Sequence, residues 1–578
     1  MVDGARGLAD RVKEARERRN APLILELDVT EGLLEAPPTD PVSAALSYRR
    51  PRLQDVLDGL RRARSDPRVR ALLVKVGGTK LSLAQAQELR DAIGELRRAD
   101  KLAVAWAETF GEFGAGNVPY LLATACERVY LQPSGDVGLT GIGLEEPFVR
   151  DALAKVGVTP QLSQRHEYKT AANTFLERGY TDPHREMSER LVASLSEQIV
   201  AGVAAARGLS EQQVRKLVDR APLLAAEALD AGLVDGLAYR DEVYDEVRGQ
   251  VGEEARTQYV TRYNRALVQN VTRRLAARRH ANTIALIHGL GPIRLGRSGR
   301  SPLGTAMGSE TVSAAFRAAI RDERVKAIVF RVDSPGGSYV ASDVIWRHVA
   351  LARRRGKPVV VSMGRVAASG GYFVSMGADA IVAQAGTLTG SIGVLAGKAV
   401  TTELMGRLGV THDAAADGGH ALMFSTNRGY SDDEWERVHA SLDRIYDDFT
   451  AKAAEGRGLD RQRVDTLARG RVWTGADAKE RGLVDELGGI ERAVTLAKEK
   501  AHLPPDVEAD LRIFPRTTPL ERLRPAESSE DPAAAAAAGA TDLEALRVAA
   551  WGRLAPLAAR LGLPAAGPLM LPGNWEVR

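Results

Sequence analysis

The feature that most constrains this chain of 578 residues is an internal repeat. Three pairs of matching segments occur in the same order in both halves: residues 65–73 with 321–329, 138–141 with 390–393, and 232–235 with 482–485. The offset between matched positions falls only from 256 to 250, as a few short loop deletions would make it do. The sequence therefore predicts two copies of one domain.

Within each copy, short apolar runs alternate with stretches of helical spacing. In the second copy residues 327–332 form such a run, the glycine turn 333–337 follows, and residues 340–355 show helical spacing. Residues 358–362 are the next apolar run and lead into a loop that holds Ser369. We expect an α/β domain whose strand ends deliver loops to one side of a sheet.

The repeat and the changes in composition divide the chain into five predicted segments. These are a charged N-terminal segment 1–20, a first repeat 21–240, a helical connector 241–280, a second repeat 281–505, and a linker with a C-terminal apolar helix or tail 506–578. Each repeat is long enough to bury its own core. Residues 543–561 have apolar side chains at helical spacing, which fits either a helix packed on the body or a partner, or an interfacial membrane helix.

The composition is typical of a soluble enzyme and does not indicate nucleic-acid binding. The net charge is only +4 from 79 basic and 75 acidic residues, and the basic run 273–279 is typical of a solvated helix face. Cys126 is the single cysteine, so no intrachain disulfide can form, and we interpret it as a buried apolar residue. We expect no metal and no cofactor.

No membrane-targeting segment is expected from the sequence. The first 20 residues carry ten charged side chains and no apolar stretch, so they predict no secretory signal. The uncharged run 380–397 contains several glycines and polar residues and does not predict a transmembrane span. We expect a cytoplasmic protein, or one peripheral to a membrane.

Two polar residues occur in one copy each and have no equivalent in the other. At the offset of 252, Ser369 corresponds to Asn117, so the first copy lacks the hydroxyl. Lys169 lies where the offset changes, and its counterpart falls among residues 419–421, which include no lysine. Neither copy alone holds a serine and a lysine at these positions, which points to a site shared between them.

Ser369 needs particular surroundings to act as a nucleophile. A base must take its proton, and backbone donors must stabilise the oxyanion of a tetrahedral intermediate. Gly370 can supply one N–H, and the turn that contains Gly336 and Gly337 can supply a second from the neighbouring strand end.

The choice of base decides the mechanism. No histidine occurs between His348 and His412, so no motif places one close after Ser369. Lys169 can serve as a base if burial lowers its pKa from about 10.4 toward 7 to 8. His420 is an alternative base, since it falls at the counterpart position of the lysine.

Several motifs together resemble the signal peptide peptidase A (protease IV) family in its long tandem form, over about residues 20–500. They are Asp333-Ser-Pro-Gly-Gly337, Ala368-Ser-Gly-Gly-Tyr372, Thr389-Gly-Ser-Ile-Gly-Val394, Tyr168-Lys-Thr-Ala171 and Val472-Trp-Thr-Gly475. The resemblance implies a tandem duplication of a Clp-protease/crotonase-like domain. It also implies a homo-oligomer, tetrameric in the tandem form, that degrades cleaved signal peptides in or near the bacterial inner membrane.

The resemblance also assigns roles to residues of this chain. It makes Ser369 the nucleophile and Lys169 the general base of a serine peptidase, with Gly370 and either Gly337 or Gly336 donating to the oxyanion. Ser391, in the Gly-Ser-Ile-Gly segment that borders the peptide groove in the family, is expected to line the site.

The chain departs from the family pattern at two places. Asp333 stands where the family often has asparagine, and the N-terminal membrane anchor of the familiar long members is not seen, so peripheral membrane contact is an alternative to residence in the membrane.

Two other functions are open on the sequence. A crotonase-type acyl-CoA enzyme would use the glycine turns for a thioester oxyanion and would not need Ser369, and a non-catalytic scaffold would need neither Ser369 nor Lys169.

Overall fold

The computed structural model describes residues 21–37, 50–78, 80–265, 282–301, 304–504, 509–515 and 569–570. The predicted N-terminal segment 1–20, the basic run 273–279 and the predicted helix 543–561 lie outside the described residues.

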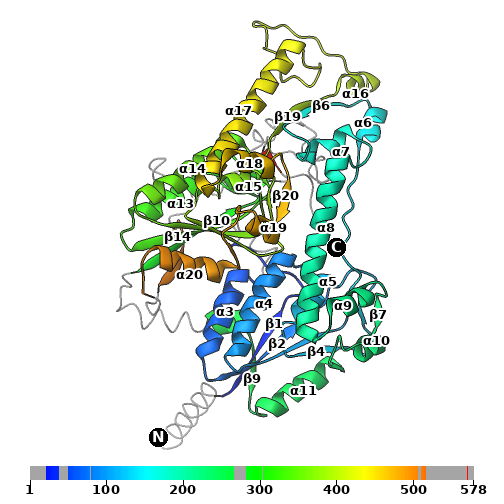
Figure 1. Ribbon diagram of the computed structural model, residues 1–578, viewed down its shortest axis with the longest axis vertical. Coiled ribbons are helices and arrows are strands. Elements are labelled where there is room, and N and C mark those ends of the chain that lie inside the picture. The colour runs from blue at the N-terminus through cyan, green and yellow to red at the C-terminus, as the bar shows by residue number, and fades with distance from the viewer. Residues whose placement is uncertain are drawn as a thin grey trace, which may run out of the picture.

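Two mainly parallel sheets form the centre of the molecule (Figure 1). The first has the strand order β8-β4-β3-β2-β1-β9, and all five neighbouring pairs are parallel. Its strands are β1 (Leu23–Asp28), β2 (Val69–Lys75), β3 (Leu102–Ala107), β4 (Arg128–Leu131), β8 (Gly236–Leu237) and β9 (Arg256–Tyr259).

The second sheet repeats this order in strands that follow one another in the same way along the chain. Its parallel neighbours run β21-β17-β16-β14-β10-β22, and β18 and β20 extend the sheet beside β16. The strands are β10 (Thr283–Leu290), β14 (Val325–Ser334), β16 (Val359–Ala368), β17 (Ala380–Ala383), β18 (Leu388–Gly390), β20 (Val472–Thr474), β21 (Glu486–Leu487) and β22 (Asp510–Ile513). The matching order confirms the predicted α/β fold with a tandem duplication.

The central strands of these sheets are apolar along most of their length because they are covered on both faces. All residues of β14 but Lys326 are buried, as is typical of parallel strands between layers of helices. Arg331 and Asp333 are the two charged residues within this buried run, and they are only 3% and 4% exposed.

Helices of the first half cover the second sheet as well as their own. Helices α3 (Leu53–Ser65) and α4 (Leu83–Arg98) lie between the two sheets in Figure 1, and α4 contacts β16. One hydrophobic core includes Ile93 of α4 together with Leu286, Val329 and Val360 of the second sheet. The two halves therefore share a continuous core.

The predicted connector 241–280 begins with elements of the first body. Helix α11 (Arg240–Val251) buries Val243 and Val247 against the first sheet, and β9 adds an edge strand to it. The first body thus continues past residue 240, because the apolar face of α11 needs the sheet to cover it.

Each half contains one long helix, α8 (Asp182–Arg207) in the first half and α17 (Asp432–Arg457) in the second. Gly208 and Gly458 end them in the left-handed conformation that glycine adopts without strain. Before α8, strand β6 (Thr159–Gln164) leaves its own half and pairs antiparallel with β19 (Leu395–Val400) of the second half. Within the described residues, no helix is both long and apolar enough to cross a bilayer.

Candidate active site

Ser369 sits on a tight turn between strand β16 and helix α15 (Gly370–Phe373). Its backbone has φ 55° and ψ −116°, a conformation that costs energy for a residue with a side chain. The turn is held because the Ser369 N–H donates to the Gly390 carbonyl oxygen at 2.8 Å and the Phe373 N–H donates to the Ser369 carbonyl oxygen. The turn thus places the Ser369 hydroxyl directly after the carboxyl end of β16.

Lys169 comes from the first half and reaches this hydroxyl. Its Nζ lies 2.8 Å from Ser369 Oγ, 3.0 Å from Ser391 Oγ and 3.2 Å from the Ser391 carbonyl oxygen. The side chain is fully buried, and no carboxylate is among the partners of Nζ in the described part of the chain. Burial lowers the pKa of Lys169 to about 7, because the charged amine loses its water and gains no counter-ion.

The backbone around Lys169 is fixed by the second half. Strand β6 leads into this segment from its pairing with β19, and the Tyr168 N–H donates to the Arg469 carbonyl oxygen at 3.2 Å. Gly470 lies directly against Lys169, where any side chain at position 470 would collide with the backbone of the lysine. The lysine therefore enters the second half through a contact that only glycine permits at this position.

Ser391 completes the surroundings of the amine. Its own backbone has φ 50°, and its N–H donates to the Arg471 carbonyl oxygen at 2.7 Å. This conformation points both the hydroxyl and the carbonyl oxygen of Ser391 at Nζ of Lys169. The residue that we expected only to line the site is thus a direct partner of the lysine.

Three glycines face one another beside Ser369. A Cβ built on Gly370 would lie 2.9 Å from Ser342 Oγ and 3.1 Å from both the Gly337 nitrogen and the Gly336 Cα, so these backbones adjoin closely. Gly370 opens helix α15, and N–H groups in a first helical turn have no partner within their helix. The Gly336 N–H, in contrast, donates to Ser334 Oγ at 3.2 Å.

A short strand from the C-terminal tail lies on the same glycines. Strand β23 (Leu569–Met570) pairs antiparallel with β15 (Gly336–Gly337), with Gly336 opposite Met570 and Gly337 opposite Leu569. The glycine edge is therefore shaped to hold an extended peptide. The sequence carried no signal for this contact beyond the apolar character of the tail.

Asp333 anchors the glycine turn to the strand that carries Ser369. Its carboxylate accepts hydrogen bonds from the Val366 N–H at 3.1 Å and from Arg365 Nε at 3.0 Å, and the side chain is 4% exposed. An asparagine at this position would keep an acceptor for Val366 and lose the ion pair with Arg365.

The matching position in the first half is closed. Asn117, the counterpart of Ser369, donates to the Gly141 carbonyl oxygen at 2.7 Å and accepts from the Gly141 N–H at 3.1 Å. Both ends of its amide are occupied by one glycine, so the side chain ties the start of helix α5 (Asn117–Ala123) to the loop that holds Gly141.

Two other candidate residues lie apart from this site. His420 is exposed, and its Nε2 pairs with Asp433 of α17 at 3.0 Å, whereas Ser369 is fully buried. Cys126 is buried, and burial raises the pKa of its thiol to about 12, so a reactive thiolate is not favoured there.

Comparison with known proteins agrees with the duplication. The family model "Peptidase family S49" matches residues 95–253 and again residues 351–504. Among solved structures, a ClpP1 mutant from Listeria monocytogenes (15% identity, TM-score 0.24) and a membrane-bound stomatin-specific protease mutant (13% identity, TM-score 0.26) cover 39% and 41% of this chain and 99% of their own chains. These TM-scores are too low to add to the fold derived above from the strand order.

Curated relatives match across most of the chain. "Serine protease SPPA, chloroplastic" from Arabidopsis thaliana is 30% identical over 475 residues, which are 81% of this chain and 68% of the relative. "Protease 4" from Salmonella typhi is 31% identical over 501 residues, which are 83% of this chain and 78% of the relative. Since both halves match one family model and these two relatives each cover more than four fifths of the chain, the chain belongs to peptidase family S49 and is a serine peptidase.

Proposed function

We propose that Ser369 and Lys169 form a catalytic dyad, split between the two halves of the chain, that hydrolyses peptide bonds. The observation that carries the proposal is the 2.8 Å contact between Lys169 Nζ and Ser369 Oγ in a buried site where the lysine pKa is about 7. A lysine with this pKa is largely neutral at slightly alkaline pH and has a lone pair for the serine proton.

The partners of Nζ fit a neutral amine. A neutral lysine has one lone pair and two N–H groups, and Nζ has three neighbours: Ser369 Oγ, Ser391 Oγ and the Ser391 carbonyl oxygen. The lone pair accepts the hydroxyl proton of Ser369, and the two N–H groups are taken up by Ser391. Ser391 is then a positioning residue that aims the lone pair at the nucleophile.

The reaction follows from this arrangement. As Ser369 Oγ attacks the carbonyl carbon of the peptide, its proton passes to Nζ of Lys169, and the developing oxyanion accepts from Gly370 and Gly337 N–H groups. Gly336 is less suited as a donor, because its N–H is held by Ser334. The lysine next protonates the leaving amine, and a water molecule, deprotonated by Lys169, hydrolyses the acyl-enzyme.

The substrates that suit the site are unfolded, extended and largely apolar peptides, such as cleaved signal peptides. The pairing of Leu569 and Met570 with the glycine edge supports an extended substrate, since it is a main-chain ladder that an extended peptide can form. A homo-oligomer, tetrameric by resemblance, and peripheral contact with a membrane stay predictions.

The test is hydrolysis of an unstructured apolar fluorogenic peptide. Ser369→Ala and Lys169→Ala are expected to lower kcat by at least about a thousandfold, as loss of a nucleophile or its base does. Asn117→Ala is the matched control in the other half and should leave kcat unchanged, as should His420→Ala. Near-normal activity of Lys169→Ala would reject the dyad, and binding of an acyl-CoA by a wild type without peptidase activity would favour the crotonase-type function.

The role of Ser391 needs a separate readout. Ser391→Ala removes one of the three hydrogen-bond partners of the amine, and we expect a loss in kcat with little change in KM. Ser391→Thr keeps the hydroxyl and should recover part of the loss. A change in KM alone would mean that Ser391 contacts the substrate and does not orient the lysine.

A further inference from the structure

The strand that leads to Ser369 contains a β-bulge. The pairing of β16 with β14 is regular as far as Met363 and resumes at Ala367. Between these positions, three residues of β16, 364–366, lie opposite one residue of β14, Asp333. The strand therefore takes up two extra residues shortly before Ser369. A bulge of this kind bends the strand and re-aims the residues that follow it.

The bulge decides which part of the neighbouring turn lies beside the serine. If the register before the bulge continued, Ser369 would lie level with Ser338. With the two extra residues it lies level with Gly336 instead, and the close approach of Gly370 to the Gly337 nitrogen agrees with this register. Two residues of an extended strand span about 7 Å. The bulge thus brings the hydroxyl to the glycine turn.

Side chains bond the backbone groups of the bulge, where the strand ladder is interrupted. The Val366 N–H donates to Asp333 Oδ1 at 3.1 Å, and the Gly364 carbonyl oxygen accepts from Thr387 Oγ1 at 2.8 Å. The side chains of Asp333 and Thr387 are both buried. Buried backbone groups without a ladder partner need such bonds, so these two side chains hold the bulge in place.

Asp333 fits directly into the bulge. A Cβ at position 364 would lie 3.0 Å from the Asp333 Cβ, so Gly364 makes room for the carboxylate. Arg365 is exposed at the outside of the bulge, and its Nε donates to the same carboxylate at 3.0 Å. Asp333 also begins the turn that contains Gly336 and Gly337. One residue therefore contacts both the strand of the serine and the turn of the glycines.

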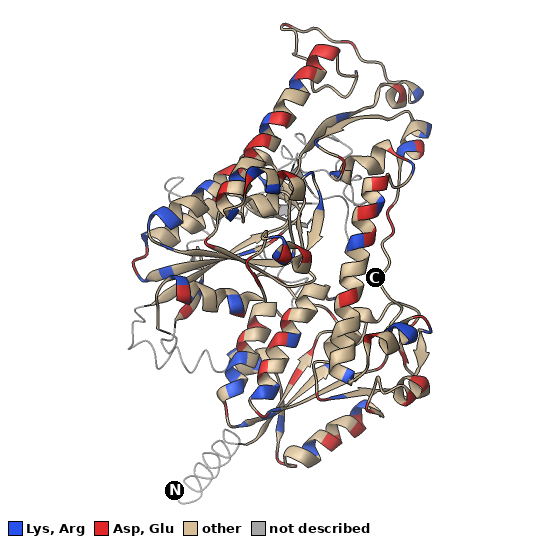
Figure 2. Cartoon of the chain, in the orientation of Figure 1, with Lys and Arg blue, Asp and Glu red and all other residues tan. Residues whose placement is uncertain are grey.

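The first half supports the same strand from the other side. Arg331 Nη1 donates to the carbonyl oxygen of Met363, the last residue before the bulge, at 3.3 Å. Its Nη2 pairs with Glu88 at 2.9 Å and with Glu35 at 3.1 Å, and both carboxylates belong to the first half. Charged residues are spread over the helices in Figure 2, but Arg331 and Glu88 are buried at the contact between the two halves.

The described part of the first half has neither the bulge nor the carboxylate. At the offset of 256, Gly77 stands in the position of Asp333. A Cβ at Gly77 would lie 2.8 Å from the Thr109 carbonyl oxygen, so the position leaves no room for a side chain. The pairing of β2 with β3 shows no shift of register. The half that has Asn117 in place of the serine thus also lacks the bulge.

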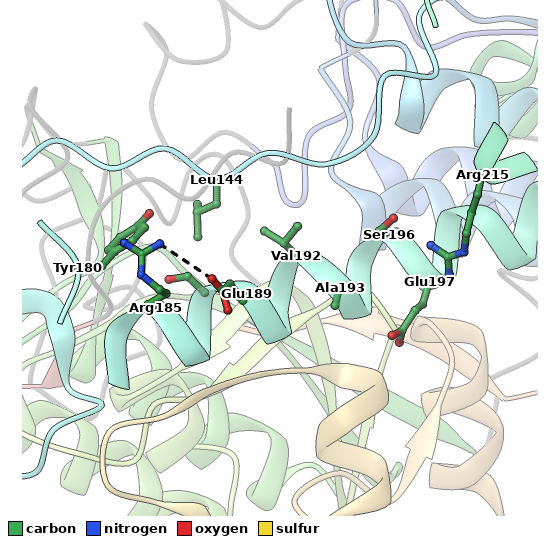
Figure 3. Close-up of a pocket in the computed structure, with 10 residues that line it drawn as sticks. Leu144, Tyr180, Arg185, Glu189, Val192, Ala193, Ser196, Glu197 and Arg215 are labelled. Atoms are coloured by element: carbon green, nitrogen blue, oxygen red, sulfur yellow. Dashed lines mark ion pairs between the residues drawn. The ribbon is translucent and has the colours of Figure 1, made fainter. Parts of the chain in front are cut away.

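The pocket of about 450 Å³ in the first half is separate from this arrangement. It lies along α8, where Val192, Ala193 and Ser196 line it (Figure 3), and neither Ser369 nor Lys169 is among its lining residues. The geometry of the peptidase site depends instead on the register of adjoining backbones.

We propose that Asp333 is a positioning residue of the peptidase, which holds the bulge 364–366 and so brings Ser369 Oγ to the N–H groups of Gly337 and Gly370. This inference rests on the proposed role of Ser369 as the nucleophile. Asp333 acts through the Val366 N–H, so an uncharged acceptor of the same shape can take its place.

The test measures kcat and KM for an unstructured apolar peptide, with urea unfolding of the same variants. Asp333→Ala removes the acceptor of the Val366 N–H. It should lower kcat by about 100-fold with little change in KM, because a misplacement of about 1 Å in a reacting group costs that much. Asp333→Asn keeps an acceptor and should recover most of this loss.

Asp379 provides a matched control at the other end of β16. Its carboxylate accepts from the Val359 N–H at 2.8 Å and from Arg353 Nε at 2.8 Å, the same two kinds of bond that Asp333 makes. Asp379→Ala should lower the urea midpoint and leave kcat unchanged. Equal losses of kcat in the two alanine variants, or a loss in Asp333→Asn as large as in Asp333→Ala, would overturn the proposal.

A second pair of variants applies if Asp333→Ala does not fold. Thr387→Val removes the donor to the Gly364 carbonyl oxygen with little change in shape, and kcat should fall while KM stays the same. Thr387→Ser keeps the hydroxyl and should recover part of the loss. An unchanged kcat in Thr387→Val would mean that the bulge does not place the serine.

Labelling with a fluorophosphonate separates this proposal from the proposed function. Ser369 Oγ displaces fluoride from phosphorus and its proton passes to Lys169, so the label should appear on Ser369 in a peptide map. The labelling rate should fall in Asp333→Ala by about the same factor as kcat. Labelling of Ser369 at the wild-type rate in that variant would reject the positioning role alone. An active wild type without label on Ser369, together with an active Ser369→Ala, would reject the nucleophile and this inference with it.

Discussion

The pKa of Lys169 makes a quantitative prediction about the pH dependence of peptidase activity. If the free enzyme is active only with a neutral lysine, kcat/KM follows the neutral fraction. With a pKa of about 7, that fraction is roughly 9% at pH 6, 50% at pH 7 and 91% at pH 8. A lysine at its ordinary pKa of about 10.4 would be only about 0.4% neutral at pH 8, some 200-fold less.

The assay is kcat/KM for an unstructured apolar peptide from pH 5.5 to 9. We expect it to rise about tenfold per pH unit below pH 6.5 and to level off above pH 8, with a midpoint near the pKa of Lys169. Circular dichroism at each pH shows whether the enzyme stays folded over the range. His420→Ala should not move the midpoint, because that ring is exposed and bonds Asp433.

Two outcomes would refute the reasoning. A rate that still rises tenfold per unit at pH 9 would mean that the lysine keeps an ordinary pKa, so burial does not neutralise it. A rate without pH dependence between 5.5 and 9 would mean that no group with a pKa near 7 controls the step.

Three further predictions concern stability and access to the site. Lys169→Met removes a buried amine whose pKa is about 7 in the folded chain and about 10.4 in the unfolded chain. Because the unfolded state binds more protons between these two pH values, the buried lysine destabilises the wild type there. In urea unfolding, the variant should be more stable than the wild type by about 4 kcal/mol at pH 7, and this gain should shrink toward zero near pH 10. Glu88→Ala removes a carboxylate that lies 2.9 Å from the buried Arg331 guanidinium. The free energy of unfolding should fall by about 3 to 5 kcal/mol in the same urea experiment, because a buried charge loses one of its partners. An unchanged urea midpoint would contradict this prediction. A chain truncated after residue 568 loses the pairing of Leu569 and Met570 with the glycine edge and should show a lower KM for a peptide, while an unchanged KM would show that the tail does not compete with substrate.

Much of the fold was visible in the sequence. The matching segments predicted two copies of one α/β domain, and the two sheets with the same strand order confirm it. The apolar runs predicted β14 and β16 because parallel strands between helices are buried along nearly their whole length. Residues 256–259 were assigned to a connector, since an exposed edge strand of four mostly polar residues has no such pattern.

The candidate site was only partly visible. The presence of Ser369 in one half and Lys169 in the other followed from the alignment of the repeats. The partnership of Ser391 with the lysine did not, because it depends on a backbone conformation with φ 50° that sequence patterns do not reveal.

The sequence alone therefore determined the duplication, the fold class and the residue types that distinguish one half from the other. Only the tertiary structure decided that Lys169 Nζ and Ser369 Oγ, 200 positions apart, lie 2.8 Å from each other in a site where the described residues offer the amine no carboxylate partner. The physical reason is that periodicity and composition report local conformation and burial, whereas the pKa of a buried amine depends on which distant segments pack against it.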